Sequence, residues 1–219
     1  MLTPFQKRAR KALGESSFFG ALSDEALRWV SRTSLRKGEV LFEKGQPSNA
    51  LFGLVGGQVK LLSTGTNGRE ICFGIFGPGE LVGEFGISTG APRHMSAVAL
   101  SNTELATINR RNLEPLLVRQ PALRDTLSEA SIEATRRLSE RIEDAAFLSI
   151  EQRVEKALFD FAHRFGETLE RGEICVPLRQ RDLADALGLS RESVSKVLTS
   201  PAMRARIELG RGKIVILRT

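Results

Sequence analysis

The distribution of glycine and proline constrains this chain more than any other feature. In residues 17–109 these residues recur about every ten positions, whereas residues 122–165 contain neither of them. Regularly spaced turns between short apolar stretches are typical of antiparallel barrels and jelly rolls, and an uninterrupted interval favours helices. The sequence therefore predicts an α+β fold, with an N-terminal β jelly roll followed by long helices.

The turn signals define six expected strands in the N-terminal part. They are residues 39–43, 50–55, 58–63, 70–76, 95–100 and 104–109. Before them, residues 24–32 are expected to form a short helix that Ser23 caps. Trp29 and Val30 are then available for its buried face.

Helices are expected from about Arg110, where the period of the apolar residues changes from two to 3.6. One narrow stripe, rich in small residues, follows the longest helix: Leu127, Ser131, Ala134, Leu138, Ile142 and Ala145. Such a stripe favours a seam between two subunits, and packing of the helix on its own β domain is the open alternative. Near Ser149 a second helix should begin, and Gly166 should end it.

Cysteine and histidine are too few for most metal sites. Two cysteines and two histidines cannot build a four-ligand zinc or iron–sulfur centre, and no metal-ligating or catalytic residue is assigned. No apolar stretch reaches the roughly 18 to 20 residues of a membrane helix. The N-terminal residues also lack the pattern of a secretory signal, so a cytoplasmic protein without membrane contacts is expected.

Most of the net positive charge lies near the C-terminus. Residues 174–219 contain nine Lys or Arg against four Asp or Glu, whereas residues 1–173 contain 23 against 22. A basic segment of this kind is typical of nucleic-acid binding, although a solvated surface can have the same composition.

Residues 180–199 have the spacing of a helix-turn-helix. Ala184, Gly188, Val194 and Val197 stand at positions 5, 9, 15 and 18 of these twenty residues. The alanine permits close crossing of two helices, the glycine permits a left-handed turn, and the valines fill the core. Ser190 should cap the second helix, whose exposed start is the part that meets base edges in such motifs.

A hairpin is expected after the helix pair and would complete a winged motif. Residues 207–209 and 214–217 are its strands, and residues 210–212 are its glycine turn. Arg211 and Lys213 lie at the tip of this wing. The combination predicts DNA binding.

In five places the chain resembles the Crp/Fnr family of bacterial transcription regulators, over about residues 17–219. The motifs are FFGALSDEAL at 18–27, KGEVLFEKGQP at 37–47, GPGELVGEFG at 77–86, AFL at 146–148 and LADALGLSRESVSKVL at 183–198. The resemblance implies a cyclic-nucleotide-binding jelly roll at residues 1–110, a long dimerisation helix at 111–148 and a winged helix-turn-helix at 149–219. One departure is Pro201, which costs about 3 kcal/mol inside a helix, so the recognition helix should stop near Thr199.

By this resemblance the protein is a homodimer that binds a palindromic operator in double-stranded DNA and contacts RNA polymerase. The expected DNA-binding residues are Arg179, Gln180, Arg181, Ser190, Arg191, Glu192, Ser193, Ser195, Lys196, Arg211 and Lys213. Arg191 and Lys196 can donate to guanine, and Glu192 can accept from the amino group of cytosine.

The resemblance also implies an effector site in the jelly roll. Its candidate residues are Gly83, Glu84, Phe85, Gly86, Arg93, His94 and Ser139. A short helix starting at residues 84–86, together with Arg93, would form an anion site. By resemblance Glu84 bonds a ribose hydroxyl and Arg93 pairs with a cyclic phosphate. The alternative is an empty barrel whose loops these two side chains bridge.

Two departures weigh against cyclic AMP as the effector. His94 and Met95 stand where cyclic AMP binders have Ser or Thr followed by Ala, and Leu138 replaces one of two polar residues that hold adenine. A cyclic nucleotide is thus one candidate cofactor, and no cofactor is certain. An iron–sulfur cluster is not expected, because residues 1–35 lack cysteine. Haem ligation by Cys72 or His94 stays open, although Cys72 fits a buried strand position.

An enzyme on a jelly-roll fold and a regulatory subunit that acts through protein contacts are the competing hypotheses. The first requires a histidine–carboxylate cluster or a nucleophile–base spacing that the sequence lacks. The winged motif argues against the second.

Overall fold

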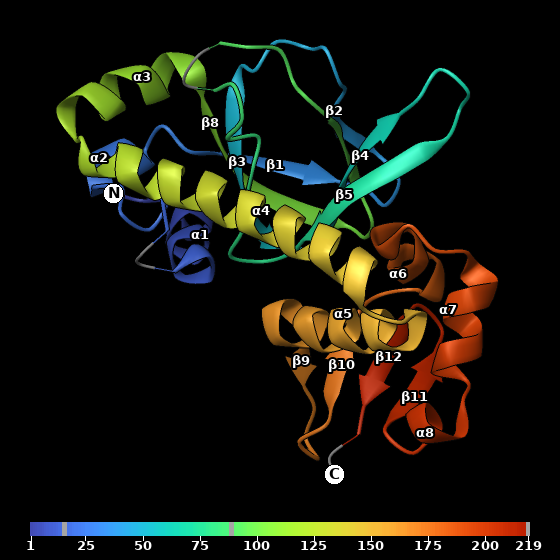
Figure 1. The fold of residues 1–219 in the computed structure, drawn as a ribbon. Helices are drawn as coiled ribbons and strands as arrows, with labels where there is room; N and C mark the ends of the chain where they lie inside the picture. Colours follow the sequence, from blue (N-terminus) through green and yellow to red (C-terminus); the bar gives the residue numbers. More distant parts are fainter. Residues whose placement is uncertain (15–16, 88–89, 218–219) are drawn as a thin grey trace. The chain divides into compact units, whose positions relative to one another are not determined.

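The computed structural model describes residues 1–14, 17–87 and 90–217 (Figure 1). It contains two compact units, Met1–Arg136 and Arg137–Thr219, and each is described by itself. Within the described ranges, no helix is both long enough and apolar enough to cross a membrane.

The first unit is built on two four-stranded sheets in which every strand pair is antiparallel. One sheet has the order β1 (Ser31–Leu35), β8 (Thr103–Asn109), β3 (Ala50–Gly56), β6 (Leu81–Val82). The other has the order β2 (Val40–Phe42), β7 (Ser96–Ala99), β4 (Val59–Thr64), β5 (Glu70–Phe76). The α+β fold with an N-terminal jelly roll is therefore confirmed.

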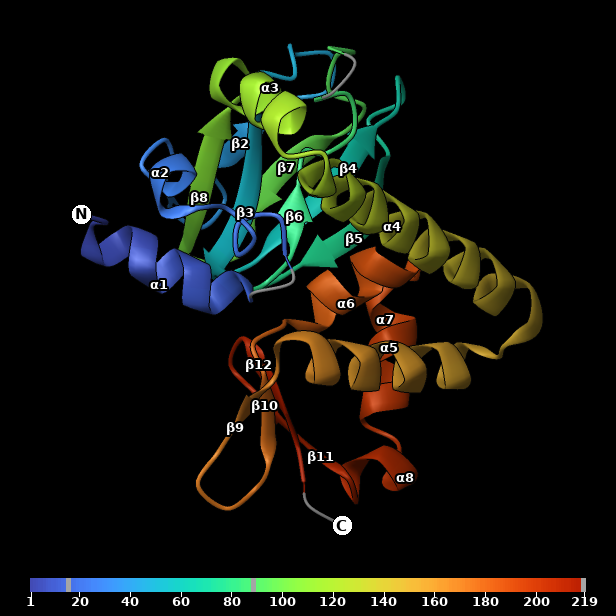
Figure 2. The same ribbon diagram turned by 90° about the vertical axis from the view of Figure 1, so that its left-hand side faces the viewer.

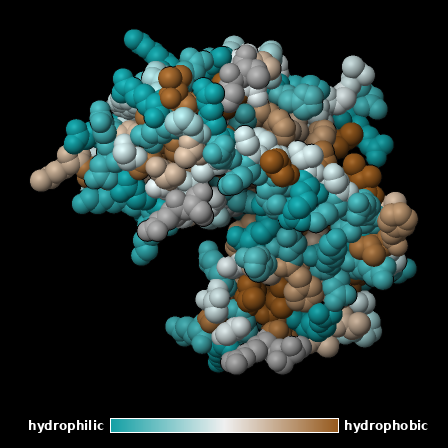
Figure 3. Space-filling model, turned by 60° about the vertical axis from the view of Figure 1, so that its left-hand side comes forward, coloured by the Kyte–Doolittle hydropathy of each residue, from teal (hydrophilic) through white to brown (hydrophobic). Residues whose placement is uncertain are grey.

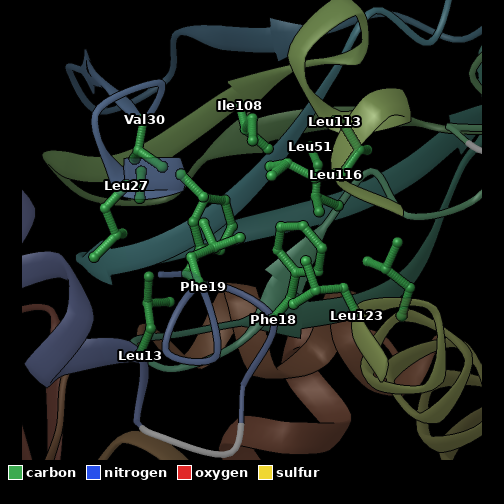
Figure 4. Close-up of a cluster of buried hydrophobic side chains, with 14 of the residues drawn as sticks. Leu13, Phe18, Phe19, Leu27, Val30, Leu51, Ile108, Leu113, Leu116 and Leu123 are labelled. Atoms are coloured by element: carbon green, nitrogen blue, oxygen red, sulfur yellow. The ribbon is translucent and has the colours of Figure 1, made fainter. Parts of the chain in front are cut away.

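Strand β3 is buried on both of its faces, because successive side chains of a strand point in opposite directions. Phe52 and Leu54 lie in the core between the two sheets. Leu51 points the other way, into a second core that it shares with helices (Figure 4). Figure 4 shows Phe18, Phe19 and side chains of later helices gathered around Leu51.

Gly53 permits the close approach of this helical layer to β3. A Cβ atom at Gly53 would lie 2.7 Å from Phe19 Cδ2 and 2.8 Å from Leu13 Cδ2. Leu13 ends helix α1 (Pro4–Leu13), which begins at a capping box formed by Thr3 and Gln6. Helix α1 was not predicted from the sequence.

The short helix predicted at residues 24–32 is wrong in length. Ser23 caps it as expected, but helix α2 covers only Asp24–Leu27, and β1 begins at Ser31. Pairing of Ser31 with Thr107 of β8 takes the following residues into a sheet. Val30 is buried as predicted, whereas Trp29 is 36% exposed.

Three helices follow the jelly roll: α3 (Arg110–Arg119), α4 (Ala122–Phe147) and α5 (Ile150–Phe165). Ser149 caps α5 through a capping box with Gln152, and Gly166 follows its last residue, as predicted. On α4, Leu127 is buried in the core of its own unit, whereas Leu138 and Ile142 are exposed. The stripe is therefore divided, and the expectation that Leu127 faces a second subunit is wrong.

The second unit contains the C-terminal part of α4, the whole of α5, a helix pair and a four-stranded antiparallel sheet (Figures 1 and 2). The remaining helices are α6 (Gln180–Leu187), α7 (Arg191–Leu198) and α8 (Pro201–Arg204). The sheet has the order β11 (Ile207–Gly210), β12 (Lys213–Ile216), β10 (Ile174–Val176), β9 (Glu167–Thr168). Helices α5, α6 and α7 contact one another, and α5 also contacts β10.

Candidate functional site

Helices α6 and α7 form the helix-turn-helix that the residue spacing predicts. Gly188 ends α6 in the left-handed conformation, with φ 64° and ψ 30°. Ser190 Oγ then accepts from the Ser193 N–H at 3.1 Å and caps α7. Val194 and Val197 are buried between the helices. The local steric reasons for these residues are thus confirmed.

The opposite side of α7 is open to solvent and carries polar side chains. Arg191, Glu192 and Lys196 are exposed, and Ser195 is half-buried. The Ser193 hydroxyl is 2.9 Å from Ser190 Oγ, so it belongs to the cap rather than to the open side. A helix of this kind presents both donors and acceptors to a groove in DNA.

Basic residues also stand before α6 and on the wing. Arg179 and Arg181 are exposed, Gln180 is half-buried, and the Arg179 N–H donates to Asp182 Oδ2 at 3.3 Å. In the wing, Arg211 and Lys213 are exposed at the turn between β11 and β12, where Gly212 has φ 79°. The predicted strand, glycine turn and strand of the wing are confirmed.

The recognition helix α7 ends at the position that was predicted from Pro201. Thr199 is the C-cap of α7, and Pro201 is the first residue of α8, which Ser200 caps. Met203 of α8 is buried, and the Leu217 N–H donates to the Arg206 carbonyl at 2.8 Å.

Arg206 joins this end of the wing to α5. Its guanidinium pairs with Glu155 and lies 4.9 Å from the centre of the Phe159 ring. Arg206, directly before β11, thus holds the wing to α5 after the departure at Pro201.

In the jelly roll, Arg93 is buried, with 5% of its surface exposed. Its Nη1 donates to the Gly83 carbonyl at 2.8 Å and its Nη2 to the Ala50 carbonyl of β3 at 2.5 Å. The guanidinium also lies over Phe42, 4.2 Å from the ring centre, and Phe42 stacks with Phe52. Among the described residues, Arg93 Nε has no hydrogen-bond partner.

Gly83 and Glu84 complete this buried group. Gly83 has φ +91°, and a Cβ atom there would lie 2.4 Å from Arg93 Nη1. Burial raises the pKa of Glu84 above its ordinary 4.5, although backbone hydrogen bonds and the charge of Arg93 act in the opposite direction. Burial also lowers the pKa of Arg93, and Glu84 partly offsets this effect. The structure thus brings together Gly83, Glu84 and Arg93 from the predicted effector set.

Three other predicted effector residues are exposed. Phe85 and His94 are exposed, and Ser139 is an exposed residue of the second compact unit. The short helix expected at residues 84–86 is wrong, because Gly86 has φ +81° and residues 85–87 form a turn.

Sequence reasoning missed the partners of Arg93 in β2 and β3. They are Phe42, Phe52 and the Ala50 carbonyl, all of them distant from Arg93 in the sequence. Cys72 is buried and its Sγ donates to the Gly74 carbonyl at 3.6 Å, as expected of a core residue. In the part of the chain that the structure describes, no three His, Cys, Asp or Glu side chains gather to hold a metal.

The raised pKa of Glu84 predicts a pH-dependent effect of Glu84→Gln on stability. The folded protein binds the Glu84 proton more tightly than the unfolded chain, so this stabilisation is complete below pH 4.5 and is lost as pH rises through the folded pKa. At neutral pH the variant should therefore have the larger free energy of unfolding, and the difference should vanish at acid pH. Urea denaturation across this range measures it, with Glu143→Gln on α4 as the control. A variant less stable than wild type at neutral pH contradicts the prediction.

Two family models match the chain. Residues 32–120 match the cyclic nucleotide-binding domain, and residues 152–219 match the Crp-like helix-turn-helix domain. The first match lies in the N-terminal unit and the second lies in the C-terminal unit, in agreement with the fold of each unit.

Relatives and solved structures agree with these matches. The CRP-like cAMP-activated global transcriptional regulator of Mycobacterium tuberculosis is 32% identical over 183 residues, which are 83% of this chain and 81% of that protein. The cyclic AMP receptor protein of Thermus thermophilus is 29% identical over 207 residues, 93% of each chain. The structure of FixK2 from Bradyrhizobium japonicum has the same fold, with a TM-score of 0.76 at 22% identity, over 86% of this chain and 93% of its own.

The likeness in sequence extends over most of both chains, and both domain models match in the order seen in the structure. This chain therefore belongs to the Crp/Fnr family of transcription regulators.

Proposed function

We propose that this regulator acts as a homodimer, which inserts one α7 helix from each subunit into successive major grooves of a palindromic operator. The observation that carries the proposal is the exposed side of α7, where Arg191, Glu192 and Lys196 stand on a helix with a fixed N-cap. Selection of binding sites from random DNA, followed by a mobility-shift titration of the selected palindrome, tests it. Failure to select any sequence contradicts sequence-specific binding.

The dimer seam is assigned to the second half of α4. Leu138 is 40% exposed and Ile142 66% exposed, and both lie on one side of the helix. On the face shown in Figure 3, hydrophilic side chains dominate and hydrophobic ones form separate groups. Apolar side chains this exposed on a long helix favour pairing with a second copy of the same helix.

Base reading is assigned to α7 and backbone binding to the residues around it. Arg191 and Lys196 donate to guanine, Glu192 accepts from cytosine, and Ser195 contacts a flanking base. The remaining predicted residues contact phosphates or support the cap: Arg179, Gln180, Arg181, Ser190, Ser193, Arg211 and Lys213. Two half-sites then lie about one helical turn apart.

A cyclic nucleotide is the effector that we assign to the jelly roll. The support is the cyclic nucleotide-binding domain match, relatives whose names include cyclic AMP, and a buried arginine beside a glycine with positive φ. Arg93 Nη1 and Nη2 already donate to two carbonyls, so a phosphate competes with the Gly83 and Ala50 carbonyls for the guanidinium. The exposure of His94 weighs against a direct role for its imidazole.

In this proposal the protein binds DNA and a nucleotide in the cytoplasm. It alters transcription through contact with RNA polymerase. No residue is assigned to catalysis. A regulator that recognises DNA and a nucleotide requires binding energy at two sites and no chemical step.

Leu138→Asp should convert the dimer to a monomer, because it places two like charges in the seam without partners. Sedimentation velocity measures the change. Ser139→Asp is the matched control, since it adds the same charge about 100° further round the helix and should leave the dimer intact. A dimeric Leu138→Asp variant means that the seam lies on another surface.

Glu192→Ala should reduce discrimination at one G·C position by about 1–3 kcal/mol, because it removes an acceptor for the cytosine amino group. Arg211→Ala should instead weaken all sequences alike and lower the salt dependence, because a wing arginine contacts phosphate. Titrations with single-base operator variants at several salt concentrations separate the two effects. Equal losses on every operator for Glu192→Ala would show that this side chain reads no base.

Arg93→Ala should lower the affinity for cyclic AMP or cyclic GMP tenfold or more, because it removes the buried cation. In a thermal-shift titration, a nucleotide at 100 times its dissociation constant stabilises wild type by about 2.7 kcal/mol. Arg93→Lys, which keeps a cation, shows whether the forked guanidinium itself is required. Unchanged affinity in a folded Arg93→Ala variant excludes the assigned pose, and the absence of any shift in wild type excludes these nucleotides as effectors.

A further inference from the structure

The C-terminal end of α6 has four carbonyl groups that cannot be satisfied within the helix, as every α-helix does. Two of them are accounted for by the turn: the Gly188 N–H donates to the Asp185 carbonyl at 3.2 Å, and the Leu189 N–H donates to the Ala184 carbonyl at 3.0 Å. The Ala186 and Leu187 carbonyls remain. These are the last two of α6, and α7 begins only four residues after Leu187.

Two arginines from outside the helix pair donate to these carbonyls. Arg153 Nη2, on α5, donates to the Leu187 carbonyl at 2.7 Å, and Arg141 Nη2, on α4, donates to the Ala186 carbonyl. Both hydrogen bonds are partly buried. A cation at a helix C-terminus is stabilised by the helix dipole as well as by the hydrogen bond, and a planar guanidinium holds one fixed orientation.

The same part of α4 is also tied to α5. Asp144, one turn after Arg141, pairs with Lys156 of α5 at 2.6 Å. Hydrogen bonding to Asp144 raises the pKa of Lys156. Between α4 and α5 the chain has only Leu148 and Ser149, and Ser149 is the cap of α5. The end of the long helix is therefore held at two points, by α5 and by the helix-turn-helix.

We infer that Arg141 is a positioning residue, which fixes the orientation of the helix-turn-helix on the long helix and thereby sets the spacing of the two half-sites. The inference rests on the proposed function, because the long helices carry the dimer seam and α7 reads the operator. Each α7 is joined to α6 by the short turn at Gly188, so its orientation follows that of α6. The hydrogen bond of Arg141 to the Ala186 carbonyl joins α6 directly to α4 rather than to α5.

The spacing of half-sites gives a readout that a loss of overall stability does not change. Adding one base pair between two half-sites rotates one of them by about 34° relative to the other. A rigid dimer pays for this rotation by distorting itself or the DNA, whereas a dimer with a loosened helix-turn-helix follows it at lower cost. The ratio of affinities between two spacings cancels any uniform loss of binding.

The experiment uses the palindrome that the full-length protein selects, together with versions one base pair longer and one base pair shorter in the centre. Wild type should bind the selected spacing about tenfold more tightly than either neighbour, and Arg141→Gln should reduce this preference to about threefold or less. Arg136→Gln is the control, because Arg136 on the same helix pairs with Glu133 of α4, and this variant should keep the preference. If Arg141→Gln does not fold, Arg141→Met, which keeps the apolar stem, takes its place with the same expectation.

A folded, dimeric Arg141 variant with the full wild-type preference overturns the inference. A wild-type protein that binds all three spacings equally also overturns it, because no fixed spacing is then set. Failure of the wild-type protein to select any palindrome contradicts the proposed function instead, so the two failures are distinguishable.

Discussion

Burial of β3 on both faces is the constraint on which the N-terminal unit depends. Leu51 and Gly53 receive the helical layer on one face, and Phe52 and Leu54 fill the space between the sheets on the other. The same strand supplies the Ala50 carbonyl to Arg93. The loop that carries Arg93 is therefore anchored to the most buried part of the unit. If the proposed nucleotide drew Arg93 away from the Ala50 carbonyl, β3 would lose a hydrogen bond, and the proposed effector site would thereby be coupled to the core.

The part of the fold that was predictable is the part in which local signals and tertiary contacts agree. The six expected strands correspond to β2, β3, β4, β5, β7 and β8, because apolar stretches between turns describe a half-buried strand well. Strand β1 escaped prediction because Ser31–Leu35 is mostly polar and becomes a strand only by pairing with β8. That pairing also shortens α2, whose propensity alone would extend it. The helix α1 lacks acidic residues in its first turn, and its place is set by contacts with β3.

The helix-turn-helix and the buried group around Arg93 also differ in how far they could be predicted from local sequence signals. Gly188 and Ser190 act on residues within a few positions of themselves, so spacing alone predicted the turn and the cap of the helix-turn-helix. The partners of Arg93 lie in β2 and β3, about 40 to 50 residues earlier, and include a backbone carbonyl that any residue type would supply. No sequence pattern specifies such a partner. The hydrogen bonds of Arg141 and Arg153 to carbonyls of α6 were beyond prediction for the same reason.

Arginine residues have two roles in this protein: some bind groups of the protein itself, and others are available to a ligand. The net charge of the chain does not distinguish these roles. The chain carries a formal charge of +6, yet Arg93, Arg141, Arg153 and Arg206 all bind groups of the protein itself. In three of these cases, Arg93, Arg141 and Arg153, an acceptor is a backbone carbonyl, which is a neutral group. Such a cation stays attractive to an anion that displaces the carbonyl, as a cyclic phosphate would at Arg93. The arginines at the end of α6 lie within the DNA-binding unit, so their charge adds to the field that attracts DNA even though they also fix the helices.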